Sequence, residues 1–160
     1  MINQIAVIGA GAMGTGIAQV FASFGYETIL YDLNQDSLVK SRNKLQDVFN
    51  MLVHKGKITD SEAKSSFGRI HFASSLAGVK NADLVIEAII EKLEVKQSLF
   101  KELEGLVSES CILASNTSSL SVTSIASACT YPDRVIGLHF FNPVPLMKLV
   151  EIIPAVQTHT

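Results

Sequence analysis

Short apolar runs alternate with longer amphipathic stretches along the chain. The apolar runs, each of the length of a buried β-strand, are 5–8, 28–31, 70–72, 84–86, 112–114, 135–138 and 149–153. Helical spacing of apolar residues connects several of them, from the first glycines to Gly25, over 36–53, over 93–107 and briefly after 119. Because parallel strands need crossover connections, this alternation predicts an α/β fold with a doubly wound, mostly parallel, Rossmann-like sheet. We predict a single domain over residues 1–160.

Composition supports a sheet that is covered on both faces. Of the 160 residues, 48% are hydrophobic and only 18% are charged, and the mean hydropathy is +0.32. The net charge of −2, without a long basic stretch, argues against binding to nucleic acid or to an anionic membrane.

Targeting and metal signals are weak. The first 26 residues carry no charge, but glycines from Gly9 to Gly25 break this segment into pieces too short to span a bilayer. Cys111 and Cys129 fit no metal-ligand spacing and lie among small and apolar residues. We therefore expect no metal site and two inert, reduced thiols in a cytoplasmic protein.

The segment Gly9-Ala10-Gly11-Ala12-Met13-Gly14 has the spacing G-x-G-x-x-G. Such a string is weak evidence alone, but here it follows a predicted strand and begins a predicted helix, as in a dinucleotide-binding turn. Gly9 would permit the tight turn, Gly11 the approach of a pyrophosphate, and Gly14 the packing of helix on strand. The free N–H groups of the first helical turn would bind the phosphate charge.

Asp32 ends the second predicted strand, 23 positions after Gly9. A carboxylate at this place accepts hydrogen bonds from the adenosine ribose and repels a 2′-phosphate, which predicts NAD rather than NADP as the cofactor. The alternative is an ordinary turn residue, because Asp32-Leu33-Asn34 also has favourable turn chemistry.

Charged residues follow the run 84–86, at the edge of an open α/β sheet where ligands bind. Glu91 and Lys96 are candidates for contact with the nicotinamide-ribose side of the cofactor. An ordinary charged helix start explains them equally well.

Oxidation of an alcohol by NAD requires a base for the hydroxyl proton, and histidine suits this task near neutral pH. His54, His71 and His159 lie in polar or terminal surroundings, whereas His139 directly follows the predicted strand 135–138. A histidine beside two phenylalanines is, by itself, more typical of a packed core.

Three segments change this interpretation: 115–120 (SNTSSL), 137–143 (GLHFFNP) and 147–151 (MKLVE). Together with the glycine turn they resemble the L-3-hydroxyacyl-CoA dehydrogenase family, and the resemblance extends from the turn to the last predicted strand. The ordered set is far more specific than the glycine turn, which occurs in many dehydrogenases.

The resemblance implies a role for each matching residue. His139 would be the general base, and Glu151 would bind its other ring nitrogen. Ser118, with Asn116 nearby, would contact the substrate, while Ser118 and Asn142 would also face the cofactor. Separately, Ser118 also suits a helix cap and Glu151 a surface strand position.

The resemblance also implies a larger protein with an acyl-CoA substrate. Lys55 lies near the position from which the family reaches the CoA phosphates, although a solvated lysine is an equal alternative. Family members continue into a helical domain that completes the acyl pocket and the dimer interface, and this domain is absent from the 160 residues. We expect a full-length homodimer or larger assembly. The competing hypotheses are a dehydrogenase of another 3-hydroxy substrate and a non-catalytic NAD-binding module.

Overall fold

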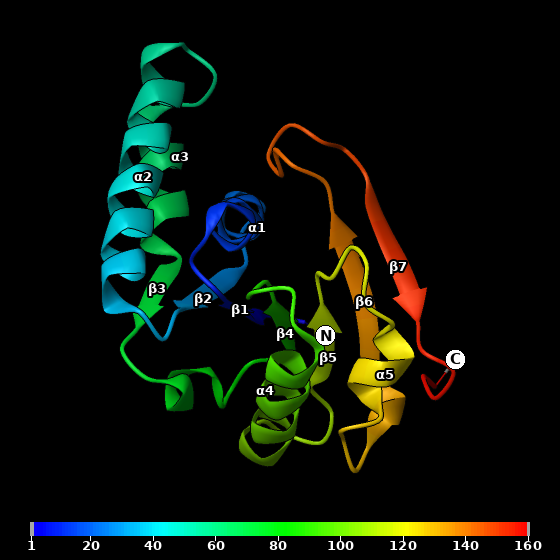
Figure 1. Cartoon of the computed structure of the whole chain (residues 1–160). Helices are drawn as coiled ribbons and strands as arrows, with labels where there is room; N and C mark the ends of the chain where they lie inside the picture. Colours follow the sequence, from blue (N-terminus) through cyan, green and yellow to red (C-terminus); the bar gives the residue numbers. More distant parts are fainter. Residues whose placement is uncertain (1, 160) are drawn as a thin grey trace.

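The computed structural model describes residues 2–159, and these form one seven-stranded sheet in the order β3-β2-β1-β4-β5-β6-β7 (Figure 1). The strands are β1 (Gln4–Ile8), β2 (Glu27–Tyr31), β3 (Ile70–Ala73), β4 (Leu84–Glu87), β5 (Ile112–Ser115), β6 (Val135–Phe140) and β7 (Val150–Pro154). All neighbouring pairs are parallel except β6 and β7, which are antiparallel. The predicted Rossmann-like, mostly parallel sheet is thus confirmed.

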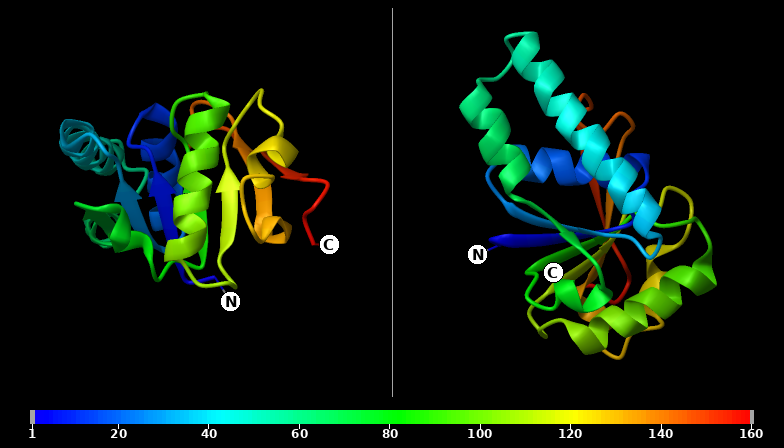
Figure 2. Two further views of the ribbon diagram at one scale, coloured as in Figure 1. Left: turned by 60° about the horizontal axis from the view of Figure 1, so that its bottom comes forward. Right: turned by 90° about the vertical axis from the view of Figure 1, so that its left-hand side faces the viewer.

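Helices cover both faces of the sheet, with α1, α2 and α3 on one side and α4 and α5 on the other (Figure 2). They are α1 (Ala12–Ser23), α2 (Gln35–His54), α3 (Asp60–Gly68), α4 (Leu93–Leu106) and α5 (Val122–Ala126), with the short 3₁₀ turns η1 (Leu76–Val79) and η2 (Pro132–Arg134). Helix α3 begins with a capping box: the Thr59 side chain accepts a hydrogen bond from the Glu62 N–H, and the Glu62 carboxylate accepts one from the Thr59 N–H.

Two hydrophobic cores lie on opposite faces of the sheet. Along β1, Ile5 and Val7 pack into the core under α1–α3, while Ala6 and Ile8 pack into the core under α4 and α5. Side chains alternate between the faces of a strand, so a strand covered on both sides is apolar throughout. This explains why the apolar runs of the sequence are continuous.

The order in which the chain adds strands to the sheet reverses between β1 and β4. The chain passes from β1 outward to β2 and β3, and then returns to build β4, β5 and β6 on the other side of β1. Connections therefore leave the carboxyl ends of β1 and β4 in opposite directions, and a crevice opens there in folds of this kind.

One strand boundary differs from the sequence expectation. β6 continues to Phe140, so His139 lies within the strand rather than after it. The cause is β7, which pairs with β6 over its last five residues and keeps them extended. Within residues 2–159, no helix combines the length and apolarity needed to span a bilayer.

Candidate active site

The glycine turn after β1 owes its shape to missing side chains. Gly9 has a φ of +105°, and a Cβ there would lie 2.6 Å from the Ala88 carbonyl oxygen. A Cβ on Gly14 would lie 1.7 Å from the Gly9 carbonyl oxygen. These two glycines therefore permit the turn and the close packing of α1 against it, as expected.

Gly11 differs, because a Cβ on it would meet no atom within 4 Å. The residue caps α1 without a side-chain hydrogen bond, and Ala12 and Met13 begin the helix, with Ala12 exposed. Open space thus faces the free N–H groups of a helix N-terminus, an arrangement that suits a phosphate.

A cavity of about 750 Å³ lies beside this turn. Gly9, Gly11 and Asp32 line it, together with residues that follow β4 and residues of α4. Its place at the switch between β1 and β4, its size and the uncovered Gly11 fit a dinucleotide.

Asp32 connects the glycine turn to the turn after β2. One carboxylate oxygen accepts a hydrogen bond from the Ala10 N–H at 2.7 Å, and the other accepts one from the Asn34 N–H at 2.8 Å. The second contact is the turn chemistry considered from the sequence. Asp32 also lines the cavity beside the glycine turn, and its predicted contact with the adenosine ribose stays a prediction.

His139 and Glu151 face each other across β6 and β7. The antiparallel register pairs the two residues directly, and His139 Nδ1 lies 2.7 Å from Glu151 Oε2. The histidine side chain is 19% exposed and the glutamate 51%. With Nδ1 bound to the carboxylate, the histidine keeps Nε2 for another proton acceptor or donor.

Ser118 lies in the loop that follows β5, the strand next to β6. It is exposed, and its N–H donates to Glu91 Oε1 at 3.1 Å. The cap of α5 is Ser121, so Ser118 is free of the capping role considered from the sequence. The predicted substrate residue Asn116 uses its side-chain oxygen to accept a hydrogen bond from the Phe140 N–H at 2.9 Å.

β5 and β6 are parallel neighbours in the register Ser115 to Gly137, so Ser118 and His139 leave the same edge of the sheet. The Asn116 hydrogen bond to the Phe140 N–H ties that edge together. The structure therefore brings the serine loop to the side of the His139–Glu151 pair.

Lys96 and Glu91 belong to a buried polar cluster. Lys96 is 1% exposed, and its amine lies 2.5 Å from Glu87 Oε1 and 3.2 Å from Glu91 Oε2. The predicted cofactor contacts of Glu91 and Lys96 stay predictions. Glu87 was not among the residues expected from the sequence; it is fully buried at the end of β4 and also accepts a hydrogen bond from the Ser115 hydroxyl at 2.7 Å.

Glu91 is the carboxylate of this cluster with a strongly shifted pKa. Partial burial would raise the pKa, but hydrogen bonds from Thr117, Lys96 and Ser119 and the charge of Lys96 outweigh it and lower the pKa to about 2. Glu91 is thus a fixed negative charge beneath the loop that carries Ser118.

Asn142 lines a second cavity of about 470 Å³ between α1, α2 and the loop after β6. A close approach bounds it, because a Cβ on Gly16 would lie 3.0 Å from the Val144 Cβ. Lys44 and Met51 of α2 form its opposite wall.

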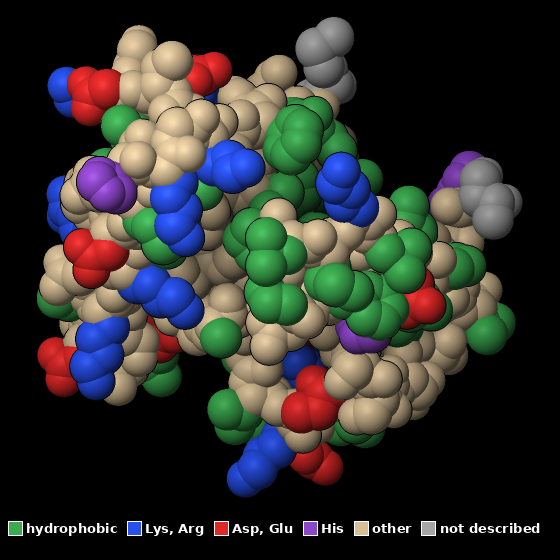
Figure 3. All heavy atoms as spheres, turned by 90° about the horizontal axis from the view of Figure 1, so that it is seen from above, with side chains coloured by type: hydrophobic (Ala, Val, Ile, Leu, Met, Phe, Trp, Pro, Cys, Tyr) green, Lys and Arg blue, Asp and Glu red, His purple; other side chains and the backbone are tan. Residues whose placement is uncertain are grey.

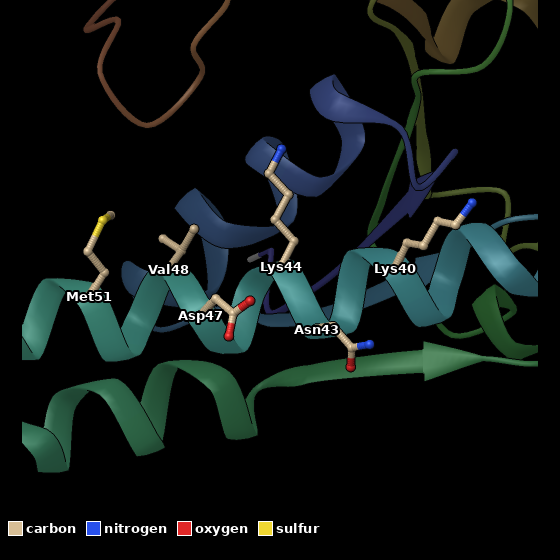
Figure 4. A pocket seen from close by; sticks show the side chains of 6 residues that line it. All are labelled: Lys40, Asn43, Lys44, Asp47, Val48 and Met51. Atoms are coloured by element: carbon tan, nitrogen blue, oxygen red, sulfur yellow. The ribbon is translucent and has the colours of Figure 1, made fainter.

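The outer face of α2 carries a shallow hollow of about 420 Å³, and Figure 4 shows Lys40, Lys44 and Met51 pointing the same way from this helix. Lys55 directly follows α2 and is exposed. Lys40 and Lys44 line this hollow, whereas Lys55 lies beyond it, and no hydrogen bond or ion pair within residues 2–159 fixes the Lys55 side chain near the other site residues.

Comparison with known proteins agrees with this geometry. Residues 4–160 match the family model described as "3-hydroxyacyl-CoA dehydrogenase, NAD binding domain". A probable 3-hydroxybutyryl-CoA dehydrogenase of Deinococcus radiodurans is 45% identical over 97% of this chain and 55% of its own length. The chain thus spans about half the length of that relative.

Solved structures show the same likeness in space. A 3-hydroxybutyryl-CoA dehydrogenase from Escherichia coli superposes with a TM-score of 0.97 at 41% identity, covering 99% of this chain and 34% of that one. An (S)-3-hydroxybutyryl-CoA dehydrogenase from Ralstonia eutropha gives 0.95 at 39% identity, covering 99% and 56%. With its glycine turn, Asp32 and paired His139 and Glu151, this chain belongs to the 3-hydroxyacyl-CoA dehydrogenase family, as its NAD-binding domain.

Proposed function

We propose that this chain supplies the NAD site and the proton-transfer pair of an L-3-hydroxyacyl-CoA dehydrogenase. The observation that carries the proposal is the 2.7 Å contact between His139 and Glu151 at the sheet edge where the serine loop also ends. A pure binding module has no use for a base with an orienting carboxylate.

His139 is the proposed general base toward the substrate's 3-hydroxyl group. Because the Glu151 carboxylate accepts a hydrogen bond from Nδ1–H, the Nε2 lone pair is free to take the hydroxyl proton. The carboxylate then lies beside the imidazolium and stabilises its charge. Bound NAD supplies the acceptor for the hydride that leaves C3 of the substrate. Glu151 therefore fixes both the tautomer and the orientation of the base.

The other site residues position the two reactants. The Ser118 hydroxyl would donate a hydrogen bond to the substrate oxygen, and Asp32 would hold the adenosine ribose. Asn142, which lines the same cavity as Lys44, would face the nicotinamide end of the cofactor. The CoA phosphates would run along α2 toward Lys55, since lysines attract phosphate oxygens as point charges.

Apolar residues surround this site on the face where the parallel strands end. Figure 3 views that face, and hydrophobic side chains gather over the β6–β7 connection and β7. Leu146, Met147, Leu149 and Ile152 are among the exposed ones. We propose that the helical domain of the family covers this surface and completes the acyl pocket and the homodimer. The two buried free thiols suit the cytoplasm.

The test measures NADH-dependent reduction of acetoacetyl-CoA by the whole protein that contains these 160 residues, with free acetoacetate as the control substrate. We expect turnover with the thioester and little with the free acid. The 160-residue chain alone should bind NADH, measured by titration calorimetry, and turn over poorly, because half of the pocket is open to water. Equal rates with both substrates would favour another 3-hydroxy acid. NADH binding without any turnover by the whole protein would refute the proposal.

A further inference from the structure

The proposed base lies on a part of β6 that extends beyond its parallel neighbour. β5 pairs with β6 only as far as Ser115 and Gly137, so residues 138–140 continue past the end of β5. On the other side these residues pair with β7, whose five residues are all exposed. Main-chain pairing therefore supports the strand segment that carries His139 from one side, and from a strand at the edge of the sheet.

Asn116 takes the place that a longer β5 would have. It directly follows β5, and its N–H donates to the Glu87 carbonyl oxygen, at the end of the central strand β4, at 2.8 Å. Its side-chain oxygen accepts a hydrogen bond from the Phe140 N–H of β6 at 2.9 Å. One residue thus connects β4 to the end of β6, through its main chain on one side and its side chain on the other.

This contact fixes the residue that follows His139. The Phe140 ring is buried in the core under α1–α3 and meets the Phe21 ring edge to face, with 6.1 Å between the ring centroids. Side chains alternate between the faces of a strand, so the His139 ring points to the opposite face of the sheet. With its ring held by the core and its N–H held by Asn116, Phe140 sets the main-chain position from which the imidazole extends.

The same amide also lies at the start of the loop that carries Ser118. Because the Phe140 N–H is a donor, it is the oxygen of the Asn116 amide that faces it, and the amide nitrogen faces away. Within residues 2–159 this nitrogen makes no hydrogen bond, which leaves it for the predicted contact of Asn116 with the substrate. The oxygen and the nitrogen of one side chain can therefore be tested for separate tasks.

We propose that Asn116 is a positioning residue for the base: its side-chain oxygen holds the end of β6 and thereby fixes His139 relative to Ser118. The inference rests on the proposed function, since the position of His139 matters only if this histidine takes the substrate's proton. Without the amide oxygen, the Phe140 N–H would lose its partner, and the strand end would shift toward another acceptor. A displacement of about 1 Å at a reacting centre can reduce turnover by about 100-fold, so a small shift is enough.

The experiment compares Asn116→Ala and Asn116→Asp in the whole protein that contains these 160 residues. Alanine removes the acceptor, so kcat for acetoacetyl-CoA reduction should fall about 10- to 100-fold, while the dissociation constant of NADH should change less than about threefold. Aspartate keeps an oxygen for the Phe140 N–H and gives up the amide nitrogen, and it should retain at least about 10 times the kcat of the alanine protein. Asn81→Ala is the matched control, because Asn81 is exposed before β4, at the opposite edge of the sheet, and its kcat should not change.

Amide hydrogen exchange, followed by NMR in the whole protein, reads the strand end directly. The Phe140 N–H should exchange at least about 10-fold faster in Asn116→Ala, whereas the Val135 N–H, at the start of β6, should keep its rate. Asn116→Ser has a side chain too short to reach the Phe140 N–H. It should behave as Asn116→Ala does, and it replaces that variant if the alanine protein does not fold.

A cycle with His139→Ala separates positioning of the base from other roles. If Asn116 acts through the base, the Asn116→Ala/His139→Ala protein should be no slower than His139→Ala alone. A general structural defect, or the loss of a direct substrate contact, would instead multiply the two losses.

Three results would overturn the inference. An unchanged kcat in Asn116→Ala would show that the base needs no support from this side chain. Equal losses in Asn116→Ala and Asn116→Asp would assign the effect to the amide nitrogen, and losses that multiply with His139→Ala would assign it to another part of the site. The proposed function fails separately, if the unaltered protein does not reduce acetoacetyl-CoA or if His139→Ala leaves kcat unchanged.

Discussion

The proposed cofactor side and the proposed chemical side of this domain are built by different means. Around Gly9 and Gly11 the site is made of main chain, shaped by residues without side chains and facing open space. Around Ser118 and His139 it depends on side chains: the Glu91 carboxylate, which the buried Lys96 contacts, accepts a hydrogen bond from the Ser118 N–H, and the Glu151 carboxylate contacts the His139 ring.

This difference has a consequence for tolerance to mutation. A main-chain site is lost when a new atom is added, whereas a side-chain network is lost when an atom or a charge is removed. Adding an atom on the cofactor side and removing one on the chemical side should therefore have different effects on the two sites.

The largest expected effect is on the chemical side. His139→Ala should lower kcat about 1000-fold, because only the proton-transfer step loses its base. NADH affinity should stay within about twofold, since His139 is not among the residues lining the dinucleotide cavity. Steady-state kinetics with acetoacetyl-CoA and NADH titration measure the two quantities. A parallel loss of NADH binding would show that His139 also supports the cofactor site, which would contradict the separation of the two sites.

On the cofactor side, adding one methyl group should be enough to destabilise the fold and weaken NADH binding. Gly14→Ala places a Cβ 1.7 Å from the Gly9 carbonyl oxygen, which forces backbone to move and should lower the free energy of unfolding by about 3 kcal/mol. NADH binding should weaken as well. Gly105→Ala is the control, because this α4 glycine has no atom within 4 Å of the added Cβ and should gain about 0.5 kcal/mol. Urea denaturation measures both, and equal stabilities would contradict the role of close packing.

The smallest effect concerns pH. The pKa of Glu91 is lowered from its ordinary value of 4.5 to about 2 in the folded protein, so its carboxylate stabilises the fold above the higher value. That contribution is lost as the pH falls from 4.5 toward 2. Unfolding free energies of the unaltered protein and Glu91→Gln should therefore converge over this range. A constant difference would show that Glu91 stabilises the loop by shape rather than charge.

Much of this fold follows from local patterns. Strands buried on both faces gave continuous apolar runs that the sequence shows directly. The glycine turn and the turn hydrogen bond of Asp32 were predictable because both depend on local main-chain geometry. The antiparallel pairing of β7 was not, since residue pattern does not determine strand direction.

The buried cluster shows why the rest escaped prediction. Glu87 and Lys96 are charged residues, and from the sequence alone a charged residue is expected at the protein surface. One signal was present: Lys96 precedes Phe100 by four positions and Leu103 by seven, on the buried stripe of α4. Only the packing of α4 against β4 and β5 reveals that the Glu87 carboxylate lies beside Lys96 and pairs with it.

The position of β7 at the end of the sheet order gives the two halves different resistance to local opening. Among residues 2–159 this strand is paired with β6 alone, and it carries Glu151, whereas β1 has strands on both sides. Edge elements detach at a lower free energy than central ones. Under mild denaturant, β7 would detach and separate Glu151 from His139 while the central strands that form the nucleotide crevice are still folded. Loss of catalysis would then precede loss of cofactor binding and give an early signal of unfolding.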